Sequence, residues 1–136
     1  MTRKTTLLSL GALAIVAVGV VLFLSLAPAD GIMTKKNGTY IVNTTKLTPN
    51  VRGYAGPTPL EITIKGDKIT DIKALPNHDT PDFFVSAKNK LFKQYKGKTV
   101  AEALALQPVG ATGATYSSRA IVTNLQEGLK YYKAHK

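Results

Sequence analysis

The chain has 136 residues, which is enough for one domain of ordinary size. It contains no cysteine, so disulfides, thiol catalysis, cysteine metal sites and lipid attachment to an N-terminal cysteine are excluded. The net charge of +10 raises the question of nucleic-acid binding, and the answer depends on where the charged part of the chain lies.

An uncharged apolar stretch occupies residues 7–27. As a helix it would span about 30 Å, the thickness of the hydrocarbon layer of a bilayer, so it predicts a transmembrane anchor. A signal peptide is the alternative, because small residues follow at Ala27 and Ala29. Residues 1–6 are predicted to be a short, basic leader on the cytoplasmic side. We therefore expect a single-pass protein of the cell membrane with an extracytoplasmic domain, where nucleic acid is not an expected partner.

The outward-facing part begins with residues 28–38, which are polar and turn-forming and are predicted to be a tether. Residues 39–44 are β-branched and aromatic and predict a strand. A loop rich in glycine and proline follows at 46–59. Three residues of this loop are expected to shape a turn: Gly53, Tyr54 and Gly56.

The clearest local signal is the alternation of apolar and polar residues in 60–75. The alternation is interrupted at Gly66 and Asp67, which predicts two strands joined by a tight turn. A slip in the alternation between Ile69 and Ile72 indicates a bulge or an edge that changes face.

Three helices are predicted in the C-terminal half. Two prolines in residues 76–84 predict a loop, after which Ser86 is expected to cap a helix at 87–95. A short helix is predicted at 99–106, and an amphipathic one at 117–132. Because helices and strands do not alternate, we expect an α+β domain with a small antiparallel sheet packed with helices, rather than a doubly wound parallel sheet.

Lysines are frequent in residues 88–98. Such a run with interleaved aromatic residues fits nucleic-acid binding, but it also fits a helix whose lysines face water. The second interpretation, which we favour, buries Leu91, Phe92 and Tyr95. A cationic face of this kind suits docking to an acidic partner protein or a surface polymer.

The stretch 110–120, GATGATYSSRA, directly precedes the last predicted helix. Unpaired N–H groups at a helix start attract phosphate, and Gly113 and Ala114 would let it approach the main chain. Further donors are present in the same stretch: Thr112, Thr115, Ser117, Ser118 and Arg119. The alternative is that Thr115 or Ser117 only caps the helix. The stretch lacks the lysine of a P-loop and does not match the dinucleotide-binding fingerprint.

Four stretches, in this order, resemble the FMN-binding domain family: NGTYIVN, RGYAGPTPLEITIKGDKITDIKAL, NHDTPDFF and TGATYSSRAIVTNLQEGLK. The likeness covers residues 38–132. The family includes the membrane-anchored flavin subunits of the sodium-translocating NADH:quinone reductase and of the Rnf electron-transport complex. The GAT-x-S stretch before a helix is the most specific element of the likeness.

The resemblance implies FMN as the cofactor. In the family, the final threonine of an S/T-G-A-T motif carries FMN through a phosphodiester bond that a separate flavin transferase installs. The matching residue is Thr115. The rest of the motif and the implied neighbours of the phosphate are Thr112, Gly113, Ala114, Ser117 and Ser118. The family usually has an aspartate six residues before the modified threonine, where this chain has Val109.

The NHDTP segment resembles a family loop that lies near the flavin ring. This implies that His78, Asp79 and Thr80 border the isoalloxazine and influence its reduction potential; a solvent-exposed loop histidine is the alternative for His78. Tyr54 and Tyr116 could stack on the ring, with Tyr116 preferred as the neighbour of Thr115. No metal cluster is expected.

The leading hypothesis is therefore a membrane-anchored extracytoplasmic FMN-binding protein, with its flavin domain at 39–136, that relays electrons between redox partner proteins. It has no catalytic constellation of its own, so an electron-transfer subunit fits better than a free-standing enzyme. The alternative is a flavin-free or reversibly flavin-binding interaction module that docks to partner proteins or surface polymers at the membrane. Val109 and the lysine run favour that alternative.

Overall fold

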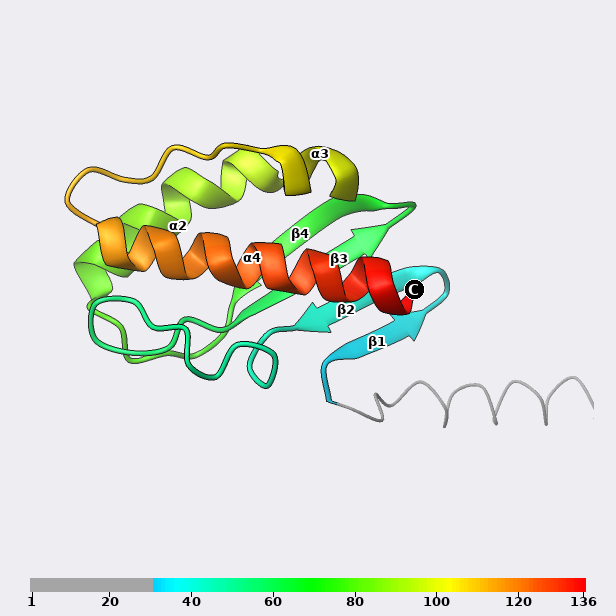
Figure 1. The fold of residues 1–136 in the computed structure, drawn as a ribbon, viewed down its shortest axis with the longest axis horizontal. Coiled ribbons are helices and arrows are strands. Elements are labelled where there is room, and N and C mark those ends of the chain that lie inside the picture. Colours follow the sequence, from blue (N-terminus) through cyan, green and yellow to red (C-terminus); the bar gives the residue numbers. More distant parts are fainter. Residues whose placement is uncertain (1–30) are drawn as a thin grey trace, which may run out of the picture.

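The computed structural model describes residues 31–136. The predicted anchor at 7–27 lies outside them, and among the described residues no helix is long and apolar enough to cross a bilayer. A four-stranded antiparallel sheet in the order β1-β2-β3-β4 packs against helices (Figure 1), which confirms an α+β fold. The elements are β1 (Met33–Lys36), β2 (Thr39–Asn43), β3 (Leu60–Lys65), β4 (Lys68–Ala74), α2 (Pro81–Tyr95), α3 (Val100–Ala105) and α4 (Thr115–His135).

The β3–β4 hairpin forms as predicted. Gly66 and Asp67 both have positive φ, 59° and 57°, as a two-residue hairpin turn between twisted strands requires. The predicted bulge is present. Thr63 of β3 pairs with Asp71 and its neighbour Ile64 pairs with Ile69, so one residue of β4 between Ile69 and Asp71 has no partner in the register. The leucine and the four isoleucines of the hairpin are all buried in the core: Leu60, Ile62, Ile64, Ile69 and Ile72.

The prediction of a tether was wrong for residues 33–36. They form β1, an edge strand that pairs with β2 through a turn at Asn37 (φ 51°) and Gly38 (φ 79°). Asn-Gly is the strongest short hairpin signal in a sequence. The segment before it, MTKK, shows no alternation of apolar and polar residues, so the sequence pattern predicts no strand there.

The predicted loop at 76–84 was wrong from Pro81 onwards. Helix α2 begins there, with Thr80 at its N-cap and Ser86 inside it. Proline fits the first position of a helix, because its missing N–H has no intrahelical partner there in any case. The interpretation of the lysine run was right: Leu91, Phe92 and Tyr95 are buried. The short helix α3 also forms, with a capping box between Thr99 and Glu102.

Helix α4 lies across the sheet, in contact with β2 and β3, and packs beside α2 (Figure 1). Gly128 makes this close approach possible, since a Cβ there would lie 2.7 Å from Cδ1 of Ile62. A buried amide fixes the helix four residues nearer its start: Asn124 donates to the carbonyl (2.9 Å) and hydroxyl (3.1 Å) oxygens of Thr58. The start of α4 is thereby held at one end of the molecule, next to the loops before β3 and after β4.

Candidate functional site

Three segments meet at the end of the molecule where α4 begins (Figure 1). The first is the predicted turn, which is confirmed: Gly53 donates its N–H to the carbonyl of Gly56 at 2.7 Å. The second is the loop 77–80 before α2, and the third is the first turn of α4. These segments are far apart in the sequence, so side-chain contacts between them are needed to hold them together.

The carboxylate of Asp79 joins the three segments. It is only 4% exposed, and it accepts hydrogen bonds from the Ser117 hydroxyl at 2.6 Å and from the Ala55 N–H at 2.8 Å. Gly53 packs directly against it, because a Cβ on Gly53 would lie 2.1 Å from Oδ2 of Asp79. Asp79 therefore lies beneath the site rather than on its surface. Its carboxylate holds the neighbouring segments by accepting two hydrogen bonds.

The first turn of α4 has no side-chain cap. Ala114 is the N-cap residue, and neither Thr115 nor Ser117 caps the helix, so the simpler interpretation of the GATGAT stretch was wrong. Ser117 donates to Asp79, while the Ser118 hydroxyl oxygen accepts the N–H of Ala111 at 3.3 Å. Across residues 31–136, the N–H groups of positions 115–117 have no hydrogen-bond partner. The start of α4 therefore offers free donors and a partial positive charge to an anion.

Thr115 is exposed and lies between two hollows. The larger measures about 590 Å³, within the range usual for ligand pockets, and Arg119 and Ser118 also line it. The smaller measures about 140 Å³ and opens between Thr115 and the turn that holds Tyr54. A group attached to the hydroxyl of Thr115 can therefore extend over either hollow.

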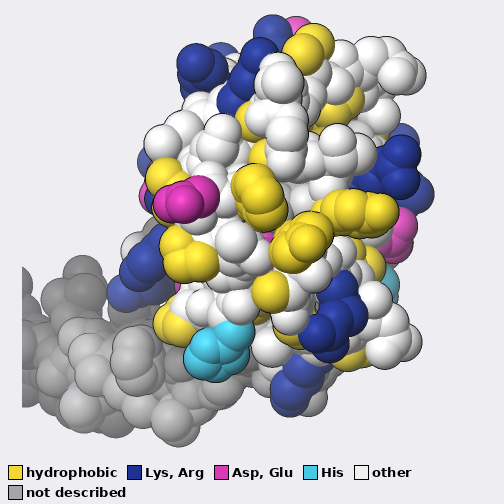
Figure 2. Space-filling model, turned by 90° about the vertical axis from the view of Figure 1, so that its left-hand side faces the viewer, with side chains coloured by type: hydrophobic (Ala, Val, Ile, Leu, Met, Phe, Trp, Pro, Cys, Tyr) yellow, Lys and Arg dark blue, Asp and Glu magenta, His cyan; other side chains and the backbone are white. Residues whose placement is uncertain are grey.

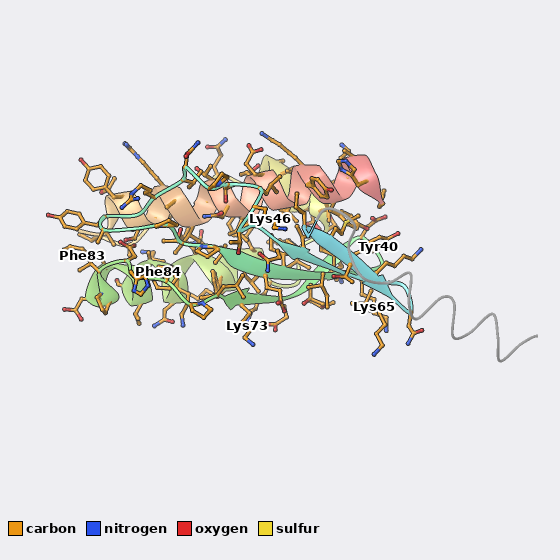
Figure 3. The ribbon with its side chains drawn as sticks, turned by 90° about the horizontal axis from the view of Figure 1, so that it is seen from below. Tyr40, Lys46, Lys65, Lys73, Phe83 and Phe84 are labelled. Atoms are coloured by element: carbon orange, nitrogen blue, oxygen red, sulfur yellow. The ribbon has the colours of Figure 1, made fainter. Side chains whose placement is uncertain are left out.

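Three exposed aromatic side chains surround the smaller hollow: Tyr54, Phe83 and Tyr116. We call these three side chains the aromatic cluster. Their exposed fractions are 63%, 36% and 61%. The Tyr54 ring centroid lies 5.4 Å from that of Phe83 and 6.1 Å from that of Tyr116. Figure 2 shows hydrophobic side chains gathered on this end of the molecule, and in Figure 3 Phe83 lies at the end while Phe84 lies further in. Flat apolar faces left open to water are typical of a binding surface.

The remaining predicted site residues lie around this centre. Thr112 and Gly113 are exposed in the loop before α4, where Gly113 has φ 79°. Thr80 is the N-cap residue of α2, and its side chain makes no capping bond. His78 is exposed. No group of three metal-ligating side chains occurs within the described part of the chain.

Two site residues were missed by the sequence analysis. Phe83 lies in α2 and not in a loop, which turns its ring toward Tyr54. Gln94 holds the loop before α4: its amide nitrogen donates to the Val109 carbonyl at 2.8 Å and its amide oxygen accepts the Val109 N–H at 3.0 Å. The Val109 side chain is 61% exposed. No sequence pattern marks either contact, because both depend on how α2 packs.

A model of the FMN-binding domain matches residues 53–130 of this chain. The matched residues include all three segments of the site and exceed half of the sequence. The chain therefore belongs to the FMN-binding domain family, and its cofactor is FMN. Searches of curated proteins and of solved structures gave no significant match.

The residues at the site fit the chemistry of FMN. Its phosphate requires hydrogen-bond donors and positive charge, which the free N–H groups of the α4 start and Arg119 offer. Its isoalloxazine requires flat apolar contacts, which the aromatic cluster offers.

Proposed function

We propose that the protein is a membrane-anchored extracytoplasmic flavoprotein that relays electrons, with FMN linked through its phosphate to Oγ1 of Thr115. The observation that carries the proposal is the position of Thr115. It is exposed at the first residue of an uncapped helix, beside free N–H donors and between two hollows.

The start of α4 would hold the phosphate. A helix start carries roughly half a positive charge, and Arg119, one turn further on, adds a full one. Gly113 and Ala114 carry little or no side chain, so the phosphate can approach the main-chain N–H groups closely. Ser118 lines the same hollow as Arg119.

The aromatic cluster would support the isoalloxazine. The loop that resembles the family's flavin-ring loop, NHDTP, lies on this side of Thr115, which favours the aromatic cluster over the larger hollow. Bound FMN supplies electron and hydride transfer. The protein's own contribution is to position the ring and shield one face of it. Asp79 acts beneath the ring as a positioning residue, because it keeps the turn with Tyr54 against the start of α4.

The openness of the site supports a role in electron relay. The aromatic cluster is at the surface, so a ring placed on it would be accessible to redox partner proteins. The apolar stretch 7–27 supports an anchor that keeps the domain beside membrane-bound partners. A flavin transferase would be needed for the bond to Thr115.

The second candidate function is a flavin-free or reversibly flavin-binding interaction module. Val109 favours it, because this position usually carries an aspartate in the family's modification motif, and here an apolar side chain is exposed there instead. The basic surface of α2 would then serve docking to partner proteins or surface polymers.

The test is to express the full chain in a host that contains a flavin transferase, and to measure visible absorbance after denaturation together with intact mass. Flavin absorbance and added mass should be lost in Thr115→Ala. Thr112→Ala is the matched control, since it ends the earlier GAT repeat, and it should keep both. An adduct retained in Thr115→Ala would contradict the assignment. Colourless unmutated protein would support the interaction module instead.

A further inference from the structure

The free edge of the sheet at β4 is only partly covered. Its first part pairs with the segment after α2: Ile69 donates to the Lys98 carbonyl at 2.9 Å, and Gly97 donates to the Ile69 carbonyl at 2.8 Å. Beyond Ile69, the strand borders a groove of about 440 Å³ that separates it from α2. We call this the β4–α2 groove.

The backbone of β4 is turned toward the groove at two residues. Leu75 donates its N–H to the Pro59 carbonyl at 3.1 Å, on the β3 side. Because an antiparallel ladder alternates, the backbone groups of Lys73 also point toward β3, whereas those of Ile72 and Ala74 point toward the open edge. No backbone hydrogen bond joins this part of the edge to another segment within residues 31–136.

The lining of the groove is strongly cationic. Four lysines line it and no carboxylate does; the lysines are Lys73, Lys88, Lys93 and Lys96. Lys96 pairs with Asp71 at 3.2 Å, just outside the lining, and the others have no ion pair with a described residue. Lys73 points to the side of the sheet away from α4 (Figure 3). The buried residues Ile72 and Phe92 add an apolar floor.

We propose that the β4–α2 groove binds an extended acidic segment of a partner protein, which adds to β4 as a further strand. Strand addition uses the backbone groups of an open sheet edge for affinity and flanking side chains for specificity. Here the flanking side chains are lysines, so alternating carboxylates on the added strand would face them. The proposal does not depend on flavin binding, because the groove shares no residue with the aromatic cluster.

Charge argues against a second copy of this chain as the occupant. Lysines on an edge strand discourage pairing with like-charged strands, and this chain carries a net charge of +10. The other edge strand, β1, has the sequence MTKK and is itself basic. An acidic segment of another protein removes the repulsion between the lysines instead of adding to it.

The test uses the full chain in neutral detergent and a short fluorescent peptide in which glutamate alternates with valine. We expect saturable binding by fluorescence anisotropy that weakens as salt increases. Lys88→Gln/Lys93→Gln should weaken binding roughly 2- to 30-fold, the combined effect of two exposed ion pairs. The matched control, Lys90→Gln/Lys133→Gln, removes the same charge outside the groove and should leave the affinity unchanged. Equal losses in the two variants would overturn the proposal, because they would show attraction to net charge alone.

Strand addition needs its own measurement. Peptide binding should slow amide hydrogen exchange between Ile72 and Ala74, and a peptide with proline in place of the central valines should bind weakly, because proline has no N–H to donate to the edge. Equal binding of the proline peptide would overturn strand addition. Inorganic polyphosphate that binds more tightly than the peptide, through the same lysines, would overturn the acidic segment as the occupant.

Discussion

The contact between Gly53 and Asp79 gives the sharpest prediction about how the site is held together. A Cβ on residue 53 would lie 2.1 Å from Oδ2 of Asp79, so in Gly53→Ala the carboxylate must move away from its donors. In Asp79→Ala the obstructing oxygen is gone, and the added methyl group can occupy the space. We therefore expect the two substitutions to be strongly coupled.

The size of the effect follows from the two hydrogen bonds of Asp79. A hydrogen bond to a charged group contributes about 1.5–3 kcal/mol, and here the Ser117 hydroxyl and Ala55 N–H would both lose their acceptor. Asp79→Ala should therefore lower the free energy of unfolding by about 3 kcal/mol. Gly53→Ala should cost about as much in the unmutated chain, but under about 1 kcal/mol in the Asp79→Ala background. The expected coupling is thus about 2 kcal/mol, within the range for residues in contact.

The assay is urea unfolding of the single and double variants, which gives the free energy of unfolding for each corner of the cycle. Gly56→Ala is the matched control, because a Cβ there meets nothing closer than 3.7 Å. It should add to Asp79→Ala without coupling. Additive effects of Gly53→Ala and Asp79→Ala would refute the view that the carboxylate joins the three segments.

Three further predictions test the packing, the pH response and the ring site. Gly128→Ala should lower the free energy of unfolding by about 1–3 kcal/mol by thermal or urea unfolding, because its methyl group would crowd Ile62. Burial and a hydrogen bond to Asp67 raise the pKa of Tyr132 to about 12, from 10.0, so this group should make stability fall as the pH rises from 10 to about 12. Tyr132→Phe should make that decline shallower in unfolding measured across this range. Tyr116→Ala should increase flavin fluorescence and weaken retention of reversibly bound FMN, whereas Tyr116→Phe should keep both near the original values, because stacking needs the ring and not the hydroxyl.

The secondary structure was predicted correctly where the apolar residues follow a regular spacing. The alternation in 60–75 gave the hairpin and its bulge, and apolar spacing gave α4, although the helix begins earlier, at Thr115. The failures came where the pattern was weak or misleading. β1 has Met33 as its single apolar residue, and the two prolines in 76–84 predict a loop although Pro81 stands at the first position of α2.

The sequence did not give the layout of the candidate site, and the roles assigned to its residues stay predictions. Thr115 is exposed at a helix start, where the sequence placed a threonine suited to hold a phosphate. The burial of Asp79 against Gly53 and Ser117 could not be predicted from the sequence. Such contacts join residues distant in sequence, and only the packing of α4 on the sheet brings them together.

The sequence could not predict which part of the fold lies beside the lysines of residues 88–98. Periodicity placed these lysines on the outer face of a helix, but not beside a particular neighbour. The fold sets that face next to a part of the β4 edge that no other residue of 31–136 pairs with, so that Lys88 and Lys93 line a groove beside this strand edge. The charged helix face thereby lines a groove with a defined shape.

The most direct test of the central claim is peptide mapping of the unmutated full chain after expression with a flavin transferase. Tandem mass spectrometry should find the flavin adduct on the peptide that contains the start of α4, with the modified fragment ions ending at Thr115. An adduct on any other residue would contradict the account. So would an unmodified chain that has no affinity for added FMN.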